Sequence, residues 1–183
     1  MKNSFLVILT LVGIQQINAQ FTRRDSLQGG LRIERTSYDV KRYDLNITIN
    51  PEQKSIKGFN EISFEVMVPT QKIQLDLFDN MKVDSIVWNT KKLKYVRDND
   101  AVFIDFPEKL TSKSNHKLKF YYSGNPRIAR NAPWDGGFVF SKDKAGKDFI
   151  AVAVQGTGAS LWYPVKDSQT DEPDNGASIK VAV

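Results

Sequence analysis

Apolar and polar residues alternate along most of this chain with a period of two, which is the pattern of β-strands with one buried face. The first clear example runs from Tyr43 to Ile49. Similar stretches recur at intervals of about 8–12 residues with turn residues between them, as in antiparallel sandwiches. The further predicted strands are Ile62–Val68, Ile73–Leu77, Val83–Trp88, Leu93–Val96, Val102–Phe106 and Leu118–Tyr122. No window shows the repeat of an amphipathic helix. The pattern therefore predicts an all-β fold, an antiparallel β-sandwich.

The last third of the chain departs from simple alternation. A loop rich in proline and glycine runs from Gly124 to Gly137, and Lys144–Lys147 has the composition of a hairpin turn. The turn joins Phe138–Phe140 to Phe149–Val154, and the latter is continuously apolar, which predicts a strand covered on both faces. The final alternating stretch, Ile179–Val183, leaves an apolar strand without a further partner. We therefore expect the sandwich to be incomplete at its C-terminus, and this chain by itself to associate or express poorly.

The first residues have the order of a secretory signal peptide. Lys2 precedes the apolar run Phe5–Ile14, and Ala19 is a small residue where a signal peptidase would cut. The run is shorter than the ~20 residues that a membrane span needs. We expect residues 1–19 to direct export to the periplasm or the medium, 20–36 to form a lead segment or linker, and 37–183 to form the β domain.

Charge and cysteine content exclude some partners and sites. The 26 Lys and Arg residues outnumber the 21 Asp and Glu residues, but the two signs are mixed along the chain. A mixed surface together with export makes nucleic acid an unexpected partner. The sequence has no cysteine, which excludes disulfides and zinc sites built on cysteine.

Candidate catalytic residues are sparse. The single histidine, His116, lies in a polar run, and we expect it to be a solvated loop residue. A zinc hydrolase needs at least three protein ligands, and the H-E-x-x-H motif is absent. Carboxylates cluster near the C-terminus, where they could form an acid and base pair or bind calcium, but acidic residues between prolines are more often structural. The cluster comprises Asp167, Asp171, Glu172 and Asp174.

One segment carries a family resemblance. The sequence Gln155-Gly-Thr-Gly-Ala-Ser-Leu-Trp-Tyr-Pro164-Val-Lys-Asp167, followed by the acidic loop, resembles the N-terminal domain of the aminopeptidase N family of zinc metallopeptidases, which includes leukotriene hydrolase. Asn131–Asp143 is similar to a loop of secreted bacterial members, and Tyr38–Ile49 with Ile56–Gly58 is similar to the family's first strand pair. The resemblance runs from Tyr38 to the end of the chain.

The resemblance implies specific roles. The side chain at the Gln155 position helps to hold the free α-amino group of a peptide substrate, and Asp167 is architectural. A neutral amide oxygen can accept hydrogen bonds from that ammonium. On residue chemistry alone, Gln155 can equally cap the turn at Gly156. The family's G-A-M-E-N and H-E-x-x-H motifs lie in the next domain. The resemblance therefore implies zinc in a catalytic domain that this chain lacks, and no cofactor or peptidase activity here.

Two other readings remain open at the level of sequence. The chain can be a stand-alone secreted β-sandwich that binds a ligand such as carbohydrate, with Trp134, Trp162 and Tyr163 as a stacking surface. It can also belong to a relative that has kept the scaffold and lost the metal site. These aromatic residues can instead be core and interface residues. A glycan screen of the chain tests the first reading, and a zinc analysis of the intact protein tests the second.

Overall fold

A computed structural model describes residues 21–183, so the predicted signal peptide at residues 1–19 lies outside the described residues. The helical elements are α1 (Arg23–Gly29), α2 (Ile33–Thr36) and the 3-10 turn η1 (Ala159–Leu161). The strands are β1 (Tyr38–Asn50), β2 (Ser55–Val66), β3 (Thr70–Asp76), β4 (Met81–Trp88), β5 (Lys91–Lys92), β6 (Lys94–Asp98), β7 (Ala101–Leu110), β8 (Asn115–Gly124), β9 (Gly137–Lys142), β10 (Asp148–Ala153) and β11 (Ala177–Ala182).

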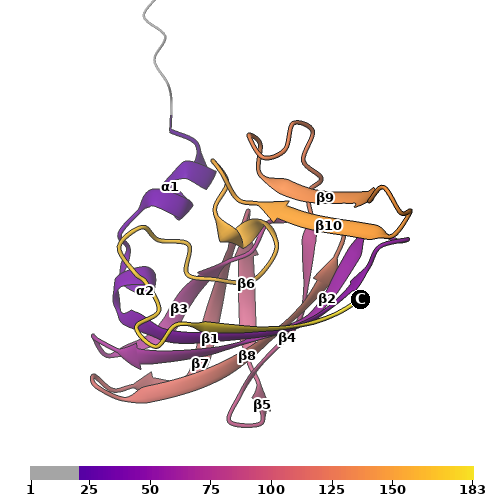
Figure 1. Ribbon diagram of the computed structural model, residues 1–183. Coiled ribbons are helices and arrows are strands. Elements are labelled where there is room, and N and C mark those ends of the chain that lie inside the picture. Colours follow the sequence, from indigo (N-terminus) through magenta and orange to yellow (C-terminus); the bar gives the residue numbers. More distant parts are fainter. Residues whose placement is uncertain (1–20) are drawn as a thin grey trace, which may run out of the picture.

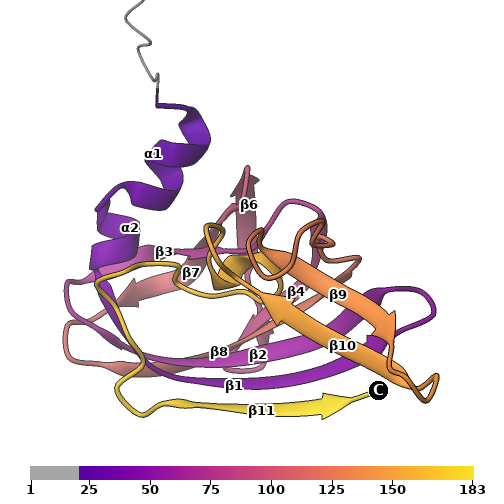
Figure 2. The same cartoon turned by 45° about the horizontal axis from the view of Figure 1, so that its top comes forward.

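Two sheets face each other across the core (Figures 1 and 2). One has six strands in the order β11-β1-β2-β8-β4-β5, and the other has three in the order β3-β7-β6. Phe106 of β7 meets both Phe64 and Trp88 of the larger sheet, with ring centroids 6.2 and 5.4 Å apart. The pairing is antiparallel except that β11 runs parallel to β1. The predicted all-β sandwich is confirmed, and the parallel edge is an addition to it.

The alternation of β1 and β2 translates directly into burial. In β1 the side chains of Tyr43, Leu45 and Ile47 are buried in the core. The two strands are joined by a turn at residues 51–54. The predicted strand Ile62–Val68 extends too far, because β2 ends at Val66 and Val68 is 46 % exposed. Pro69 cannot donate a ladder hydrogen bond, so the alternation outlasts the strand.

The lead segment folds into two short helices, which the sequence pattern did not predict. The first is capped by Thr22, whose Oγ1 accepts from the backbone amide of Asp25, while the Asp25 carboxylate accepts from the amide of Thr22. Both helices lie at one end of the molecule, and α2 packs against β3 (Figure 2). Only Leu27 of α1 is a buried apolar residue. No helical repeat was visible because arginine ion pairs, rather than an apolar stripe, dock this segment.

The hairpin of β9 and β10 forms a separate two-stranded sheet (Figure 1). Phe138 and Ile150 pack toward the core, and the hairpin turn falls at the predicted lysines. The prediction that Phe149–Val154 is covered on both faces is wrong for the described chain, because Phe149 is 52 % exposed and Val152 and Val154 are also exposed. A continuous apolar run does not reveal whether a second layer of this chain covers its outer face.

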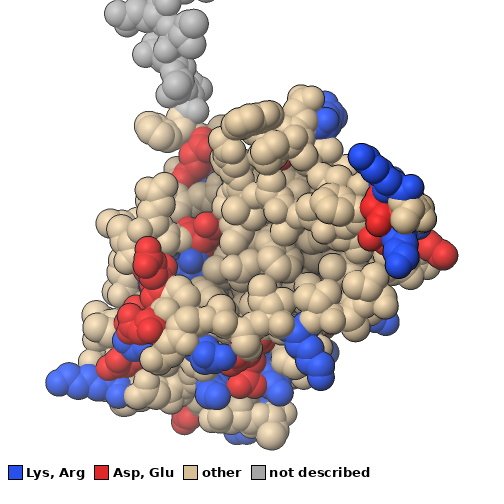
Figure 3. All heavy atoms as spheres, in the orientation of Figure 1, with Lys and Arg blue, Asp and Glu red and all other residues tan. Residues whose placement is uncertain are grey.

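Charged side chains lie around the margin of the face seen in Figure 3, with blue and red interspersed, whereas its middle is formed by uncharged residues. Within residues 21–183, no helix has the length and hydropathy that a membrane crossing requires.

Candidate substrate-contact turn

Gln155 lies on the surface, in the turn that follows β10. The turn is closed by the amides of Thr157 and Gly158, which donate to the carbonyl oxygen of Val154 at 3.1 and 3.0 Å. Thr157 Oγ1 donates to the same oxygen at 3.1 Å. The Gln155 side chain makes no hydrogen bond within residues 21–183, so it does not cap this turn. The residue is exposed.

Asp167, which the resemblance identified as architectural, joins the loop after Pro164 to the residues that follow this turn. Its Oδ2 accepts from Ser160 Oγ at 2.6 Å and from the Ser160 amide at 3.3 Å. Gly158 has a φ of 78°, in the left-handed region that glycine adopts without strain, and it lies directly against the Asp167 carboxylate. The turn and the loop after Pro164 thus form one interlocked unit.

A buried ion pair connects Asp167 to the sandwich. Arg35 Nη1 of α2 lies 2.8 Å from Asp76 Oδ2 of β3, and the two side chains are 3 % and 1 % exposed. The same carboxylate oxygen accepts from the Asp167 amide at 3.2 Å, and Arg35 Nη2 donates to the Asp167 carbonyl oxygen. Gln74 Nε2 donates to Asp76 Oδ1 at 2.7 Å. Burial raises the pKa of Asp76 to about 6, although Arg35 acts in the opposite direction.

Sequence reasoning missed Arg35 and Asp76. On β3, Gln74 and Asp76 alternate with the apolar residues Ile73 and Leu75, and this pattern normally describes a solvated outer face. In the structure both polar side chains are buried, because the lead segment covers them. The only local signal was a run of arginines in the lead segment, and it did not identify their partners.

Two of the other acidic residues of the C-terminal loop, Asp171 and Asp174, have structural contacts. Asp171 forms an ion pair with Lys166, whose ammonium also donates to the Tyr38 carbonyl oxygen at 2.6 Å. The Asp171 and Lys166 side chains are both buried. Asp174 is exposed and pairs with Lys41 at 2.7 Å. Each of these two carboxylates is paired with a lysine, and in residues 21–183 no three acidic or histidine side chains are grouped to hold a metal ion such as calcium.

The expectation that His116 is a solvated loop residue is wrong. It lies on β8, partly buried between the rings of Phe64 and Trp88, at centroid distances of 5.6 and 5.7 Å. Its Nε2 lies 2.7 Å from Ser114 Oγ, and burial lowers its pKa. The sequence did not reveal this contact, because β8 begins at Asn115, within the polar run, whereas the alternation predicts a strand only from Leu118. In residues 21–183 no three His, Cys, Asp or Glu side chains are grouped to hold a metal, so these residues do not fit a zinc site.

The three aromatic residues proposed as a stacking surface do not share an exposed face. Trp162 and Tyr163 pack edge to face at 4.7 Å, and Trp162 also packs on Phe138 at 6.0 Å. Both are partly buried against the core, whereas Trp134 is 76 % exposed. Carbohydrate stacking on all three is therefore incompatible with this packing.

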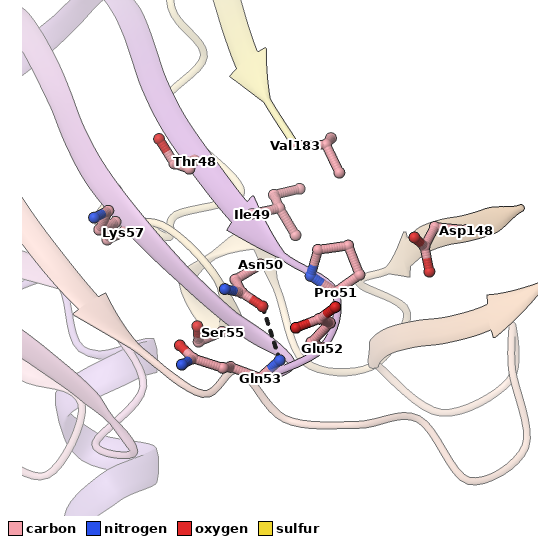
Figure 4. A pocket seen from close by; sticks show the side chains of 10 residues that line it. All are labelled: Thr48, Ile49, Asn50, Pro51, Glu52, Gln53, Ser55, Lys57, Asp148 and Val183. Carbon is pink, nitrogen blue, oxygen red and sulfur yellow. Dashed lines mark hydrogen bonds between the residues drawn. The ribbon is translucent and has the colours of Figure 1, made fainter.

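Two surface hollows lie near the ends of β10. One, of about 730 Å³, is bordered by Gly156–Gly158, by Gln28–Leu31 and by Asp167–Thr170. The other, of about 510 Å³, lies at the turn from β1 to β2, where Asp148 and Val183 face Pro51 and Glu52 (Figure 4). The Asn50 side chain accepts from the Gln53 amide in its wall at 2.8 Å. Only the first hollow adjoins the turn that carries Gln155.

Known proteins share this fold. The sequence profile of the peptidase M1 N-terminal domain matches residues 39–183. An M1 zinc metallopeptidase from Deinococcus radiodurans superimposes with a TM-score of 0.61 at 23 % identity, over 79 % of this chain and 32 % of that chain. Another structure of an M1 zinc metallopeptidase from that organism, a mutant bound to a Tyr-Ser-Ala substrate, gives 0.60 at 23 % identity over the same shares. Yeast LTA4 hydrolase in complex with bestatin gives 0.61 at 15 % identity, over 79 % of this chain and 23 % of that chain.

No curated protein sequence matches the chain. The identities to the solved structures are low enough that those structures support the fold alone. The chain spans about a third of the length of the Deinococcus enzymes that it matches. The family match extends over most of the sequence, in the region where the resemblance had been recognised. The chain therefore belongs to the peptidase M1 family, of which it carries the N-terminal domain.

Proposed function

We propose that this chain is the non-catalytic N-terminal β domain of an exported, zinc-dependent aminopeptidase, and that it supplies the scaffold and one side of the substrate cleft. Membership in the peptidase M1 family supports this proposal. The partners are the catalytic domain of the same polypeptide and a peptide substrate. Zinc, when bound in that catalytic domain, supplies an activated water for amide hydrolysis. The residues described here do not fit the metal and take part through binding and orientation.

One observation carries the proposal. Gln155 is exposed without a side-chain hydrogen bond among residues 21–183, on a turn whose Gly158 packs against the Asp167 carboxylate. A substrate ammonium can donate a hydrogen bond to the Gln155 side-chain oxygen. Binding to an uncharged acceptor on a prearranged turn has a low free-energy cost, because no carboxylate has to be desolvated and no loop has to be ordered. This geometry suits recognition of a free N-terminus.

The test uses the intact protein encoded by the gene, purified with its metal content measured, and a panel of L-aminoacyl 4-nitroanilides with their N-acetylated counterparts. We expect zinc-dependent hydrolysis of the free amines alone. Gln155→Ala should raise KM about tenfold with little change in kcat, as expected for a lost hydrogen bond to a charged group. Gln53→Ala, in the exposed turn between β1 and β2, is the matched control.

Failure to hydrolyse the free amines would reject the aminopeptidase, and an intact protein without zinc would identify a relative that lost its metal site. Equal rates with acetylated substrates would reject recognition of the α-amino group. If Gln155→Ala behaves like Gln53→Ala, the role of Gln155 is wrong even though the enzyme class holds.

Export is the second part of the proposal and is supported by the order of residues in the first 19 positions. Cell fractionation followed by N-terminal peptide mapping should find the mature protein outside the cytoplasm, beginning at Gln20. A cytoplasmic protein that retains Met1–Ala19 would contradict it.

A further inference from the structure

We propose that Arg35 is a positioning residue for the substrate-contact turn, so that the lead segment ahead of the domain sets the position of Gln155. This inference rests on the proposed role of Gln155 and extends it. The chain of contacts has four steps, each between described residues.

The first step is the double contact of the Arg35 guanidinium. Nη1 donates to the Asp76 carboxylate on β3 at 2.8 Å, and Nη2 donates to the backbone carbonyl oxygen of Asp167. A planar guanidinium can make both contacts with one fixed geometry, whereas a lysine ammonium is a single point of charge on a flexible stem. Arg35 thus ties the loop after Pro164 to the rigid sheet.

The second step fixes the backbone of Asp167 from its other side. The Asp167 amide donates to the same Asp76 oxygen at 3.2 Å. Both polar groups of this peptide backbone are therefore held by the buried pair. Next to it, the backbone groups of Asp76 and Val165 exchange hydrogen bonds at 2.8 and 3.0 Å. This stretch of the loop is therefore bonded directly to Asp76 of β3.

The third step runs through the Asp167 side chain. Its carboxylate accepts from Ser160 within η1 and lies against Gly158. The fourth step is the turn itself, in which Gly158 donates to Val154 across Gln155. A shift of the Asp167 backbone therefore displaces the carboxylate against which Gly158 packs, and the turn that presents Gln155 moves with it.

The lead segment is attached firmly enough to act in this way. Arg23 pairs with Asp98 at 2.8 Å, and Arg24 Nε donates to the buried carboxylate of Asp100 at 2.6 Å. These contacts hold α1 on the three-stranded sheet, while Leu27 presents its carbonyl oxygen to Arg35 at 3.2 Å. The hollow beside the turn is bordered by this same segment. Residues that precede the β domain in sequence are thus in place to shape the substrate side of the cleft.

The test compares Arg35→Lys with Arg97→Lys in the intact protein. Arg97 is a matched control because its guanidinium also donates to backbone carbonyl oxygens, those of Leu77, Met81 and Asn99, and among the described residues it has no hydrogen bond to the loop after Pro164. Arg35→Lys retains a positive charge for Asp76 but loses the double contact. Thermal melting of both variants establishes that they are folded before any other comparison.

The first readout does not depend on activity. Hydrogen exchange should become about tenfold faster in Arg35→Lys at the amides of Thr157 and Gly158, and it should stay unchanged there in Arg97→Lys. Unchanged exchange at these amides, or equal acceleration throughout the domain, would overturn the positioning role.

The second readout is kinetic. Arg35→Lys should raise KM for aminoacyl 4-nitroanilides about fivefold with kcat nearly unchanged, and its combination with Gln155→Ala should be no worse than Gln155→Ala alone. Multiplicative effects in the double variant would overturn the proposal. Faster exchange at the turn in a protein without aminopeptidase activity would support the positioning role and reject the proposed function.

Discussion

Asp167 lies directly over Gly158, so closely that a β-carbon on Gly158 would lie 2.7 Å from both Cγ and Oδ1 of the carboxylate. The glycine also has a φ of 78°. The position therefore excludes a side chain for two reasons, the backbone conformation and the neighbouring carboxylate. This contact joins the turn that carries Gln155 to the network that Arg35 and Asp76 build behind it.

Gly158→Ala tests this contact directly. Gly156, with a φ of 70° and open space at its β-carbon, is the matched control because it shares the backbone conformation without the contact. We expect Gly156→Ala to lower the free energy of unfolding by about 1 kcal/mol and Gly158→Ala by about 2–4 kcal/mol, since the second variant adds overlap to strain. Urea unfolding measures both. Equal losses of unfolding free energy in the two variants would show that the Asp167 carboxylate moves aside without an energetic cost.

The buried carboxylate of Asp76 predicts a pH dependence of stability. Its pKa is raised by burial to about 6 from an ordinary value of 3.8, so the native protein binds this proton more tightly than the unfolded chain does. The Asp76 contribution to the free energy of unfolding is therefore largest below about pH 4, declines as the pH rises toward 6, and is constant above. The decline is on the order of 3 kcal/mol.

Asp76→Asn removes this titration while keeping the shape of the side chain. The measurement is urea unfolding of both proteins at several pH values between 3.5 and 8. Taking the difference between the two proteins cancels the other carboxylates, among them Asp44 and Asp98, whose pKa values are lowered by arginine partners and which act in the opposite direction. A difference that does not vary with pH would contradict the raised pKa.

The acidic loop offers a comparison between a buried and an exposed ion pair. Asp171→Asn leaves the buried ammonium of Lys166 without its countercharge, and it should lower the free energy of unfolding by about 3–5 kcal/mol. Asp174→Asn breaks an exposed pair with Lys41, and it should leave the free energy of unfolding nearly unchanged. Thermal or urea unfolding checks both. If the two variants behave alike, the loop is not pinned by Asp171.

His116 provides a test of where zinc is held in the intact protein. His116→Phe should leave the zinc content, measured by inductively coupled plasma mass spectrometry, the same as in the unaltered protein. Because the ring packs between Phe64 and Trp88, the free energy of unfolding should change by no more than about 1 kcal/mol. A proportional loss of zinc would place a metal ligand in this domain after all.

The strands were predictable because burial of one face makes apolar and polar residues alternate with a period of two, which can be recognised within a few consecutive residues. Tyr43–Ile49 and Leu118–Tyr122 show this, and both lie within the strands found in the structure. The family was recognisable from Gln155, Pro164 and Asp167, whose spacing lies within one segment. In each case the information is local, so the sequence alone can carry it.

What covers an outer face is not local information. Gln74 and Asp76 have the alternation of a solvated face, yet the lead segment buries them, and Phe149–Val154 has the composition of a covered strand, yet its outer side is exposed. His116 was misplaced for the same reason, because the aromatic rings on either side of it come from β2 and β4.

The sequence by itself determined the all-β class, most of the strands and the family, and it identified Gln155 as a candidate. Only the tertiary structure decided that Arg35 and Asp76 bind the backbone of Asp167, next to the turn that carries Gln155. The physical reason is sequence separation. Arg35, Asp76 and Asp167 come from three distant segments, and no pattern within any one of them specifies that packing brings their charges and backbone groups within hydrogen-bonding distance.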